Sequence, residues 1–380
     1  MQVNSNNHKI LYIFGSGRRN KIQKNSFDSS EFFYGYFYIK KKYKNTNYIE
    51  MLPEGEKLNT FQKLLNIIDK VLRKFSNLPF FIHLITTRNN FEHIKDSNKI
   101  IATNDRLGIS SLPMFIYAKY KDQNKRLIFI VMGLFSKKYG NKFIYTIQNF
   151  FLKYIIKNVN NLIFLGKGEY ELAKLRYPRF ESKFKFVPFG INLNFWNPSK
   201  KYNPNSNDYI LFIGNDGNRD FNKLIDISNN LSNIKIKIVT NQNISQKIKN
   251  NNTEVIYGDW NSSALTDVEL KNLYENAVLP FLPLKETFQP SGQSVTLQSM
   301  SLGVPVMITK TKGFWDLDNF KHKENIYFVE SNNTEDWSKH INSVISNSEL
   351  LENLSRNSID TVNRLYNQKM FFEKLENFIK

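Results

Sequence analysis

The chain has 380 residues, of which 41% are hydrophobic, 14% aromatic and 23% charged. This is the composition of a folded protein of about two domains, and it excludes global disorder. The chain contains no cysteine, which excludes disulfides, a thiol nucleophile and cysteine-ligated zinc or iron–sulfur sites.

The formal net charge is +19, and residues 1–200 carry 34 of the 53 basic but only 13 of the 34 acidic residues. A basic half predicts an anionic partner there, either a lipid surface, a polyphosphate or a nucleic acid. An AT-rich genome would also raise the lysine content without selection for binding. No nucleic-acid-binding module is recognisable, so nucleic acid is not a predicted partner.

The N-terminus has no apolar stretch after a basic start, and the longest apolar run, 127–135, is too short to span a membrane. A cytoplasmic location is therefore expected.

Short apolar runs alternate with stretches of helical spacing in the first half. The first run, 9–14, is followed at once by Gly15 and Gly17. Further strands are predicted at 80–85, 99–102, 127–131, 162–165 and 184–187, and helices at 60–75 and 143–159. This alternation predicts a mainly parallel sheet covered by helices.

The pattern stops at 197–208, which is rich in Pro, Asn and Ser, and then restarts. Strands are predicted at 209–213, 235–239, 254–257, 278–282 and 305–309, and helices at 221–231, 267–276, from about 293, and from 334 to the end of the sequence. Two α/β domains in tandem place a ligand site at the carboxyl ends of their strands.

The segment 289–306 is the most informative part of the sequence. Ser291, Gly292, Gln293 and Ser294 form a turn that leads into a helix, which Gly303 ends. Small residues at a helix start present backbone N–H groups to an anion, helped by the helix dipole. An ordinary N-cap by Ser291 or Ser294 is the alternative interpretation.

This segment resembles the donor-site signature of family 4 glycosyltransferases, which are retaining enzymes of the GT-B fold. Residues 298–306 match the second half of that signature, and 186–192, 209–219 and 254–283 resemble other segments of the family in the same order. The similarity covers about the last 220 residues. It implies an α/β fold of two Rossmann-like domains with a cleft between them.

The chain departs from the family at the two glutamates of the signature. The second glutamate, which usually contacts the donor ribose, falls on Gln298, and the first falls on Pro290. Glu286 is the nearest carboxylate, twelve residues before Gln298. Either an amide and backbone groups hold the ribose or Glu286 reaches the site; an amide still bonds hydroxyls but loses the charge-assisted bond.

A second turn, 214–220, corresponds to the family segment that binds the donor diphosphate. Asn215 replaces the usual Arg, and Arg219 falls near the usual Lys. An Arg at a strand-to-helix turn grips phosphate oxygens with two parallel hydrogen bonds. Arg219 is the predicted catalytic cation, with Asn215 and Lys223 as further donor-binding candidates. The alternative is that Arg219 pairs with Asp216 or Asp220 or caps a helix.

Candidate residues of the first half follow its strands. In the family, the loop after the first strand faces the cleft, so Gly15 and Gly17 are predicted to bind the donor. Asp105 follows strand 99–102 and is predicted to orient the acceptor hydroxyl or act as a base; an Asn-Asp turn is the alternative. His83 lies in an apolar run, which predicts core burial, and the other histidines lack ligand spacing, so no metal site is predicted.

Aromatic and basic residues interleave at 32–44 and 137–157. This suits a surface that meets anionic lipid headgroups, with core strands and solvated loops as the alternative.

These patterns and the resemblance together predict a glycosyltransferase that moves a sugar from a nucleoside-diphosphate sugar to a glycan or lipid-linked acceptor, with retention and without a metal or other cofactor. The predicted domains are an acceptor-side domain at 1–196, a linker at 197–208 and a donor domain at 209–365, with helix 366–380 packing back on the first domain. An inactive sugar-nucleotide or glycan-binding protein would explain the missing glutamates, and a nucleotide-sugar epimerase or a glycogen-synthase-like enzyme of the same fold is a further alternative.

Overall fold

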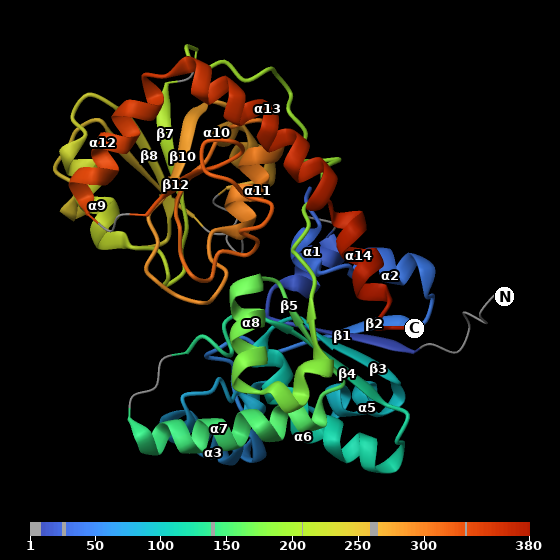
Figure 1. Cartoon of the computed structure of the whole chain (residues 1–380). Helices are drawn as coiled ribbons and strands as arrows, with labels where there is room; N and C mark the ends of the chain where they lie inside the picture. The colour runs from blue at the N-terminus through green and yellow to red at the C-terminus, as the bar shows by residue number, and fades with distance from the viewer. Residues whose placement is uncertain (1–8, 25–27, 138–140, 207, 259–264, 331–332) are drawn as a thin grey trace. The chain divides into compact units, whose positions relative to one another are not determined.

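A computed structural model describes residues 9–24, 28–137, 141–206, 208–258, 265–330 and 333–380. The chain divides into two compact units (Figure 1). The first unit comprises Met1–Ser26, Phe32–Val187 and Phe372–Lys380; the second comprises Phe27–Glu31 and Pro188–Phe371.

The first unit is built on a parallel sheet of six strands in the order β2-β1-β3-β4-β5-β6. The strands are β1 (Ile10–Phe14), β2 (Thr46–Glu50), β3 (Lys99–Ala102), β4 (Arg126–Val131), β5 (Asn161–Phe164) and β6 (Phe184–Phe186). The helices are α1 (Arg18–Lys24), α2 (Tyr36–Lys42), α3 (Thr60–Ser76), α4 (Ile82–Ile85), α5 (Arg88–Asp96), α6 (Asp105–Lys121), α7 (Lys142–Asn158) and α8 (Lys167–Arg176).

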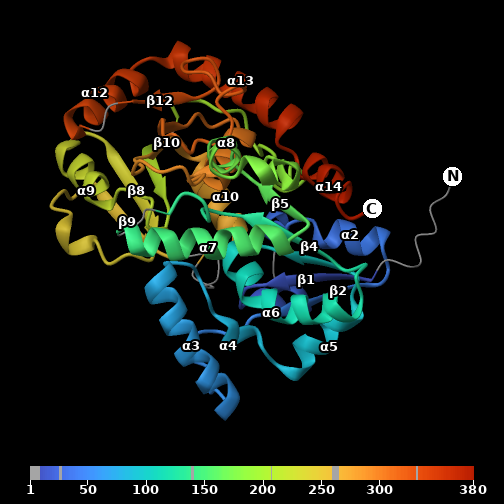
Figure 2. The ribbon, with the colours of Figure 1, turned by 60° about the horizontal axis from the view of Figure 1, so that its bottom comes forward.

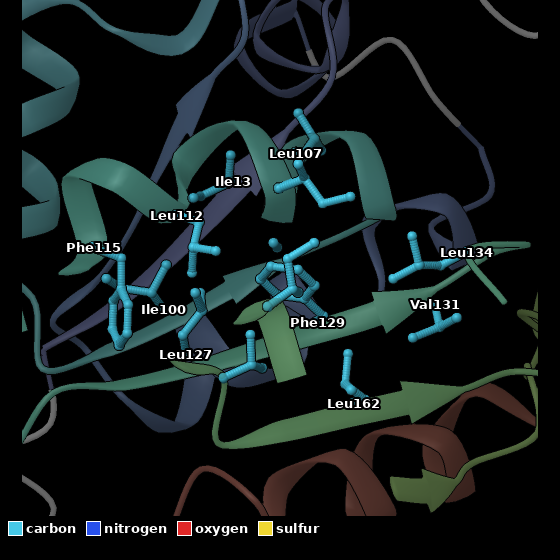
Figure 3. Close-up of a cluster of buried hydrophobic side chains, with 14 of the residues drawn as sticks. Ile13, Ile100, Leu107, Leu112, Phe115, Leu127, Phe129, Val131, Leu134 and Leu162 are labelled. Carbon is cyan, nitrogen blue, oxygen red and sulfur yellow. The ribbon is translucent and has the colours of Figure 1, made fainter. Parts of the chain in front are cut away.

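The core of this unit lies between the sheet and its helices. The central strands are buried on both faces, so they are continuous apolar runs rather than alternating ones. Figure 3 shows β4 side chains such as Leu127 and Phe129 packed with Leu107, Leu112 and Phe115 of α6. The burial of such side chains is the main stabilising term of the unit.

The second unit repeats the architecture with a parallel sheet in the order β12-β11-β10-β7-β8-β9. Its strands are β7 (Tyr209–Ile213), β8 (Lys235–Thr240), β9 (Thr253–Tyr257), β10 (Ala277–Leu282), β11 (Met307–Thr309) and β12 (Tyr327–Val329). Its helices are α9 (Phe221–Asn230), α10 (Asp267–Glu275), α11 (Gln293–Ser301), α12 (Thr334–Ile345) and α13 (Ser348–Leu365), and α14 (Gln368–Glu376) begins in this unit. The predicted α/β class with two Rossmann-like domains is confirmed.

The predicted strand at 80–85 is wrong, because Ile82–Ile85 form the short helix α4. An apolar run of this length does not distinguish a buried strand from a buried helix. His83 is buried, as predicted, and its backbone N–H and ring Nδ1 both contact Asp69 Oδ2, at 2.9 and 2.6 Å. These contacts hold α4 against α3. The strand β2 was not predicted.

The aromatic residues of 32–44 lie partly in the core of the first unit. Phe33, Tyr36, Ile39 and Tyr43 are all buried, and the rings of Tyr36 and Phe14 of β1 lie 5.6 Å apart. These side chains agree with the alternative interpretation of a core. The other aromatic residues of the segment are half-buried and its lysines are exposed, so a lipid-facing role of 32–44 stays a prediction.

The two units exchange short segments of chain. The second unit begins at Pro188, and Ile191 pairs with the chain after α13, its N–H donating to Tyr366 O at 2.9 Å. The last residues, from Phe372, belong to the first unit, where Glu376 accepts a hydrogen bond from Tyr43 at 2.7 Å. In the opposite sense, Phe27–Glu31 belong to the second unit.

Candidate functional site

Arg219 lies in the turn between β7 and α9 of the second unit. Only 3% of its surface is exposed. The turn is fastened to the chain after β10, because Asp220 N donates to Pro283 O at 3.0 Å and Lys285 N to Asn218 O at 2.9 Å. These bonds hold the guanidinium at the carboxyl end of the sheet, where ligands of such folds bind.

The guanidinium of Arg219 is incompletely paired. Its Nε donates to Ile213 O at 3.4 Å, and Nη1 lies 3.3 Å from Oδ2 of the half-exposed Asp216. Nη1 is buried and has no hydrogen bond among the described residues. Burial lowers the pKa of Arg219, while Asp216 and Tyr274 oppose that shift. A buried cation without full pairing is costly unless an anion completes it.

Two glycines leave the space that the Arg219 side chain occupies. A Cβ at Gly214 would collide with Arg219 Nε. A Cβ at Gly292 would lie 3.7 Å from Arg219 Nη1 and 3.1 Å from Ile308 Cδ1, and Gly292 has a φ of 78°, which favours glycine. The structure therefore brings the turn 214–220 and the turn before α11 together, as the sequence predicted. Gly214 was not among the predicted site residues. Its position directly after a predicted strand could have indicated a close approach of another group to the backbone there.

Helix α11 begins at Gln293, directly beside this cation. Its N-cap is Gly292, which has no side chain and therefore gives no side-chain cap. Ser291 and Gln293 are buried and Ser294 is half-buried, and Ser291 Oγ donates to Gln289 O at 3.4 Å. The positive end of a helix and a buried guanidinium together form a site for an anion such as a diphosphate.

Three other residues predicted to bind the sugar donor form polar contacts with neighbouring protein groups. Asn215 joins strand ends, since its Oδ1 accepts from Thr240 Oγ1 at 3.1 Å and its Nδ2 donates to Gly258 O at 3.3 Å. Lys223 is buried, with Nζ 3.7 Å from Asp220 Oδ2. Glu286 is exposed and accepts from Lys312 N at 2.9 Å. These contacts favour structural roles for Asn215 and Glu286; a donor contact by any of the three stays a prediction.

Gln298 lies in a buried polar cluster that the sequence did not predict. Its Nε2 donates to Glu31 Oε1 at 2.9 Å, and its Oε1 accepts from Tyr274 Oη at 3.2 Å. Glu31 also accepts from Trp196 Nε1 at 2.8 Å and from Ser29 Oγ. All five residues belong to the second unit, and both polar ends of the Gln298 amide are occupied by this cluster.

The cluster explains why residue 298 is an amide. Glu31 is 1% exposed, and burial raises its pKa, with the hydrogen bonds from Ser29, Gln298 and Trp196 opposing the shift. A glutamate at 298 would bring a second buried carboxylate against the first. Tyr274 links the cluster to the site electrostatically, because the Arg219 charge opposes the upward shift of the Tyr274 pKa that burial causes.

The predicted donor residues of the first unit lie after β1. Gly17 has a φ of 93°, and its carbonyl accepts from Lys21 N at 3.4 Å, where α1 begins. Gly15 has open space where a Cβ would be. The strand and glycine turn form as expected, and the role of Gly15 and Gly17 in donor binding stays a prediction.

Asp105, the predicted acceptor-side carboxylate, is buried at the start of α6. Its Oδ1 accepts from Met132 N at 3.1 Å, and Asn104 caps the helix. Glu169 of α8 holds the same loop, with its two oxygens accepting from Gly133 N at 2.9 Å and Phe135 N at 2.8 Å. This placement favours a structural role for Asp105 in shaping the loop after β4; a role as base stays a prediction.

We expect the stability of the first unit to fall as pH rises. Burial raises the pKa of Asp105 from 3.8 to about 7 and that of Glu169 from 4.5 to about 8, where the nearby Asp105 charge adds to the shift. The folded unit therefore holds protons that the unfolded chain releases, and it loses stability between about pH 4 and pH 8. The D105N variant should unfold at a higher temperature than wild type at pH 8 and at about the same temperature at pH 4.5. A wild-type melting temperature that rises over this window would contradict the assignment.

Within the ranges that the structure describes, no group of three or more His, Asp or Glu side chains could hold a metal ion. No helix in those same ranges is long and apolar enough to cross a membrane.

A cavity of about 450 Å³ in the second unit is lined by residues of β7, β8, β9 and α10, among them Tyr209, Ile256 and Glu269. Lys237, which lines it, forms an ion pair with Glu254, with Nζ 3.2 Å from Oε2, and the same Nζ lies over the Tyr209 ring. Its lining includes neither Arg219, Gly214 or Gly292 nor any residue of α11.

The second unit matches a known protein family. Residues 207–361 match the family described as Glycosyl transferases group 1. The match to this glycosyltransferase family contains Arg219, the glycines around it and the whole of α11. Among curated protein sequences, none matches the chain.

Solved structures share the fold over nearly the whole chain. A glycosyltransferase from Rickettsia africae is 12% identical with a TM-score of 0.63, covering 98% of both chains. Anabaena HepE in complex with UDP and glucose is 11% identical with a TM-score of 0.63, covering 98% of this chain and 99% of HepE. Sucrose-phosphate synthase from Thermosynechococcus elongatus is 10% identical with a TM-score of 0.65, covering 98% of both chains. The whole chain therefore shares the fold of these structures, and residues 207–361 match the glycosyltransferase family.

Proposed function

We propose that the protein transfers a sugar, a hexose or a related unit, from a nucleoside-diphosphate sugar to a glycan or lipid-linked acceptor. The observation that carries this proposal is the buried Nη1 of Arg219, which has no hydrogen bond within the described residues and lies beside the start of α11. A diphosphate would supply the missing acceptor and would also meet the helix dipole.

The proposed role of the site is to stabilise the negative charge that develops on the leaving diphosphate. When the bond between the sugar and the diphosphate breaks, the leaving oxygen gains charge that Arg219 and the amides of Gly292, Gln293 and Ser294 would stabilise. Such fixed donors in a buried site favour the transition state over the ground state. We propose a front-face reaction with retention, in which the leaving phosphate helps to deprotonate the acceptor, without a metal. This is the reaction implied by the resemblance to family 4.

The other finer assignments are also proposals. The HepE structures that share the fold contain UDP with glucose and UDP-glucose, which supports a nucleotide-sugar donor here. The basic first half supports an anionic or lipid-linked acceptor, and synthesis of a cell-surface polysaccharide or glycoconjugate on the cytoplasmic side of the membrane is the process that this acceptor fits.

A thermal-shift screen with UDP, GDP, ADP and their sugars tests the donor site. We expect one diphosphate to raise the melting temperature of the wild type. The G214A variant should lose that shift, because its Cβ displaces the Arg219 side chain.

The G217A variant is the matched control. Gly217 lies in the same turn, and no atom lies within 4 Å of where its Cβ would be. G217A should therefore keep the nucleotide shift. Stabilisation of G214A and wild type to the same degree would contradict the assigned site.

A binding protein without transferase activity is the second candidate. The observation that favours it is the Gln298 side chain, which the buried cluster occupies on both sides. Release of UDP or another diphosphate in the presence of donor and acceptor separates the two, since a binding protein would show the thermal shift without release.

A further inference from the structure

Helix α3 of the first unit buries a polar face and exposes most of its large apolar residues. The residues that it buries are Gln62, Asp69 and Ser76. Asp69 accepts from His83 at 2.9 Å, and Ser76 Oγ donates to Leu72 O at 2.5 Å. An amphipathic helix of a globular unit normally buries the opposite face.

The outer face of α3 is a broad apolar stripe. Successive members are three or four residues apart along most of the helix, so they share one face. The members, with their exposed fractions, are Phe61 59%, Leu64 56%, Ile67 60%, Ile68 45%, Val71 50% and Phe75 42%. Six large apolar side chains exposed together are more than scattered surface residues explain.

Helix α7 extends this stripe. The two helices are in contact, and the rings of Phe75 and Phe143 lie 6.4 Å apart. Phe143 and Phe150 of α7 are 62% and 65% exposed. Figure 2 shows α3 projecting from the first unit beside α7. We call the exposed apolar side chains of α3 and α7 the α3–α7 face.

The exposed charged side chains of α3 and α7 are all basic. Lys63, Lys70 and Lys74 are exposed on α3 at spacings of seven and four residues, so they form one row beside the apolar stripe. Lys142, Lys153 and Lys157 are exposed on α7. The sequences of the two helices contain a single carboxylate, Asp69, and it is buried against His83.

We propose that the α3–α7 face docks on the surface of an anionic lipid bilayer, with α3 lying in the plane of the headgroups. The apolar stripe would enter the boundary between headgroups and acyl chains, and the flanking lysines would meet lipid phosphates. The argument rests on the first unit alone and does not depend on the donor site of the second.

Charge decides between a bilayer and a second copy of the chain. An interface between two copies of this face would bring lysine rows together without any exposed carboxylate from either helix to pair with them. Like charges at an interface oppose association. An anionic bilayer neutralises the same lysines.

Vesicle sedimentation of the full chain tests the proposal. We expect binding to vesicles of phosphatidylcholine mixed with phosphatidylglycerol, weakening at high salt, and much weaker binding to phosphatidylcholine alone. The L64Q/I67Q/I68Q variant should lose on the order of tenfold in partitioning or more, and K63Q/K70Q/K74Q should lose the preference for phosphatidylglycerol.

Matched controls change the same chemistry elsewhere on the first unit. The Y117Q/Y120Q/L175Q variant alters three other exposed apolar residues, and K41Q/K44Q/K121Q removes three other exposed lysines. Both controls should bind like wild type. Melting temperatures of all four variants check their folding.

A second measurement uses the absence of cysteine. An environment-sensitive dye on I67C should shift to shorter wavelength with phosphatidylglycerol vesicles, while the same dye on Y120C should not. Several results would overturn the proposal: no vesicle binding by wild type, equal loss in the control variants, equal dye shifts at both positions, or binding to an acidic polypeptide but not to vesicles. Because the dye is read without nucleotide, failure here would leave the thermal-shift result with diphosphates intact.

Discussion

The R219A variant is expected to lose about 10²- to 10³-fold in kcat/KM for sugar transfer, because it removes a fixed donor from the leaving diphosphate. The loss should appear mainly in kcat if the guanidinium bonds the leaving oxygen more strongly as charge develops than it bonds the intact donor. Rates of diphosphate release at saturating and limiting donor separate the two parameters.

The stability of R219A should stay close to that of wild type. The buried cation is paired with only a half-exposed carboxylate at 3.3 Å, so removing it also removes a desolvation cost. A melting temperature within a few degrees of wild type together with a large kinetic loss would separate a functional role from a structural one.

Two controls sharpen this result. R219K keeps the charge but loses the two-pronged geometry of the guanidinium, and should fall between R219A and wild type. R364A removes an exposed arginine of α13 that pairs with Asp360 at 3.2 Å, and should leave transfer unchanged. An R219A variant with wild-type kinetics would contradict the proposed role of this residue.

Most of the fold could be predicted because buried parallel strands are short apolar runs separated by helices. The ranges predicted for β3 and β7 agree with the observed strands, and both belong to continuous buried runs. The strand predicted at 80–85 is wrong because a short helix that is buried on several sides has the same run of apolar residues as a buried strand. Strand β2 has only two buried residues, Thr46 and Ile49, among its five positions, and they do not follow the period of two of a half-buried strand, so the sequence carries little signal for it.

The site could be predicted where its geometry is local in sequence. Arg219 lies in the turn between a strand and a helix, and Gly292 directly precedes a helix, so topology places both at one edge of the sheet. The environment of Gln298 could not be predicted in this way. Its partners at 31 and 274 are far from it in sequence and from each other, and their contact depends on the path of the segment Phe27–Glu31 into the second unit.

The Q298E variant should be destabilised by on the order of 3 kcal/mol at neutral pH. Its new carboxylate would face Glu31 across the present 2.9 Å contact, in a buried cluster where Trp196, Ser29 and Tyr274 do not neutralise a second charge. The loss should shrink as pH falls toward 5, because burial and mutual repulsion raise the pKa of both carboxyls and one of them takes up a proton. Urea unfolding of the full chain, followed by tryptophan fluorescence, measures this effect.

Exchanging the two groups tests the cause. The E31Q/Q298E double variant again has one carboxylate and one amide, and Glu at 298 would accept from both Gln at 31 and Tyr274. It should recover most of the stability lost in Q298E, whereas a merely steric effect at 298 would persist in the double variant. Recovery would show that the amide at 298 and the carboxylate at 31 form one unit. The double variant also carries the glutamate that the resembling family has at this position. Comparing its affinity for the sugar donor with that of wild type would test whether a carboxylate at 298 strengthens ribose binding in this fold.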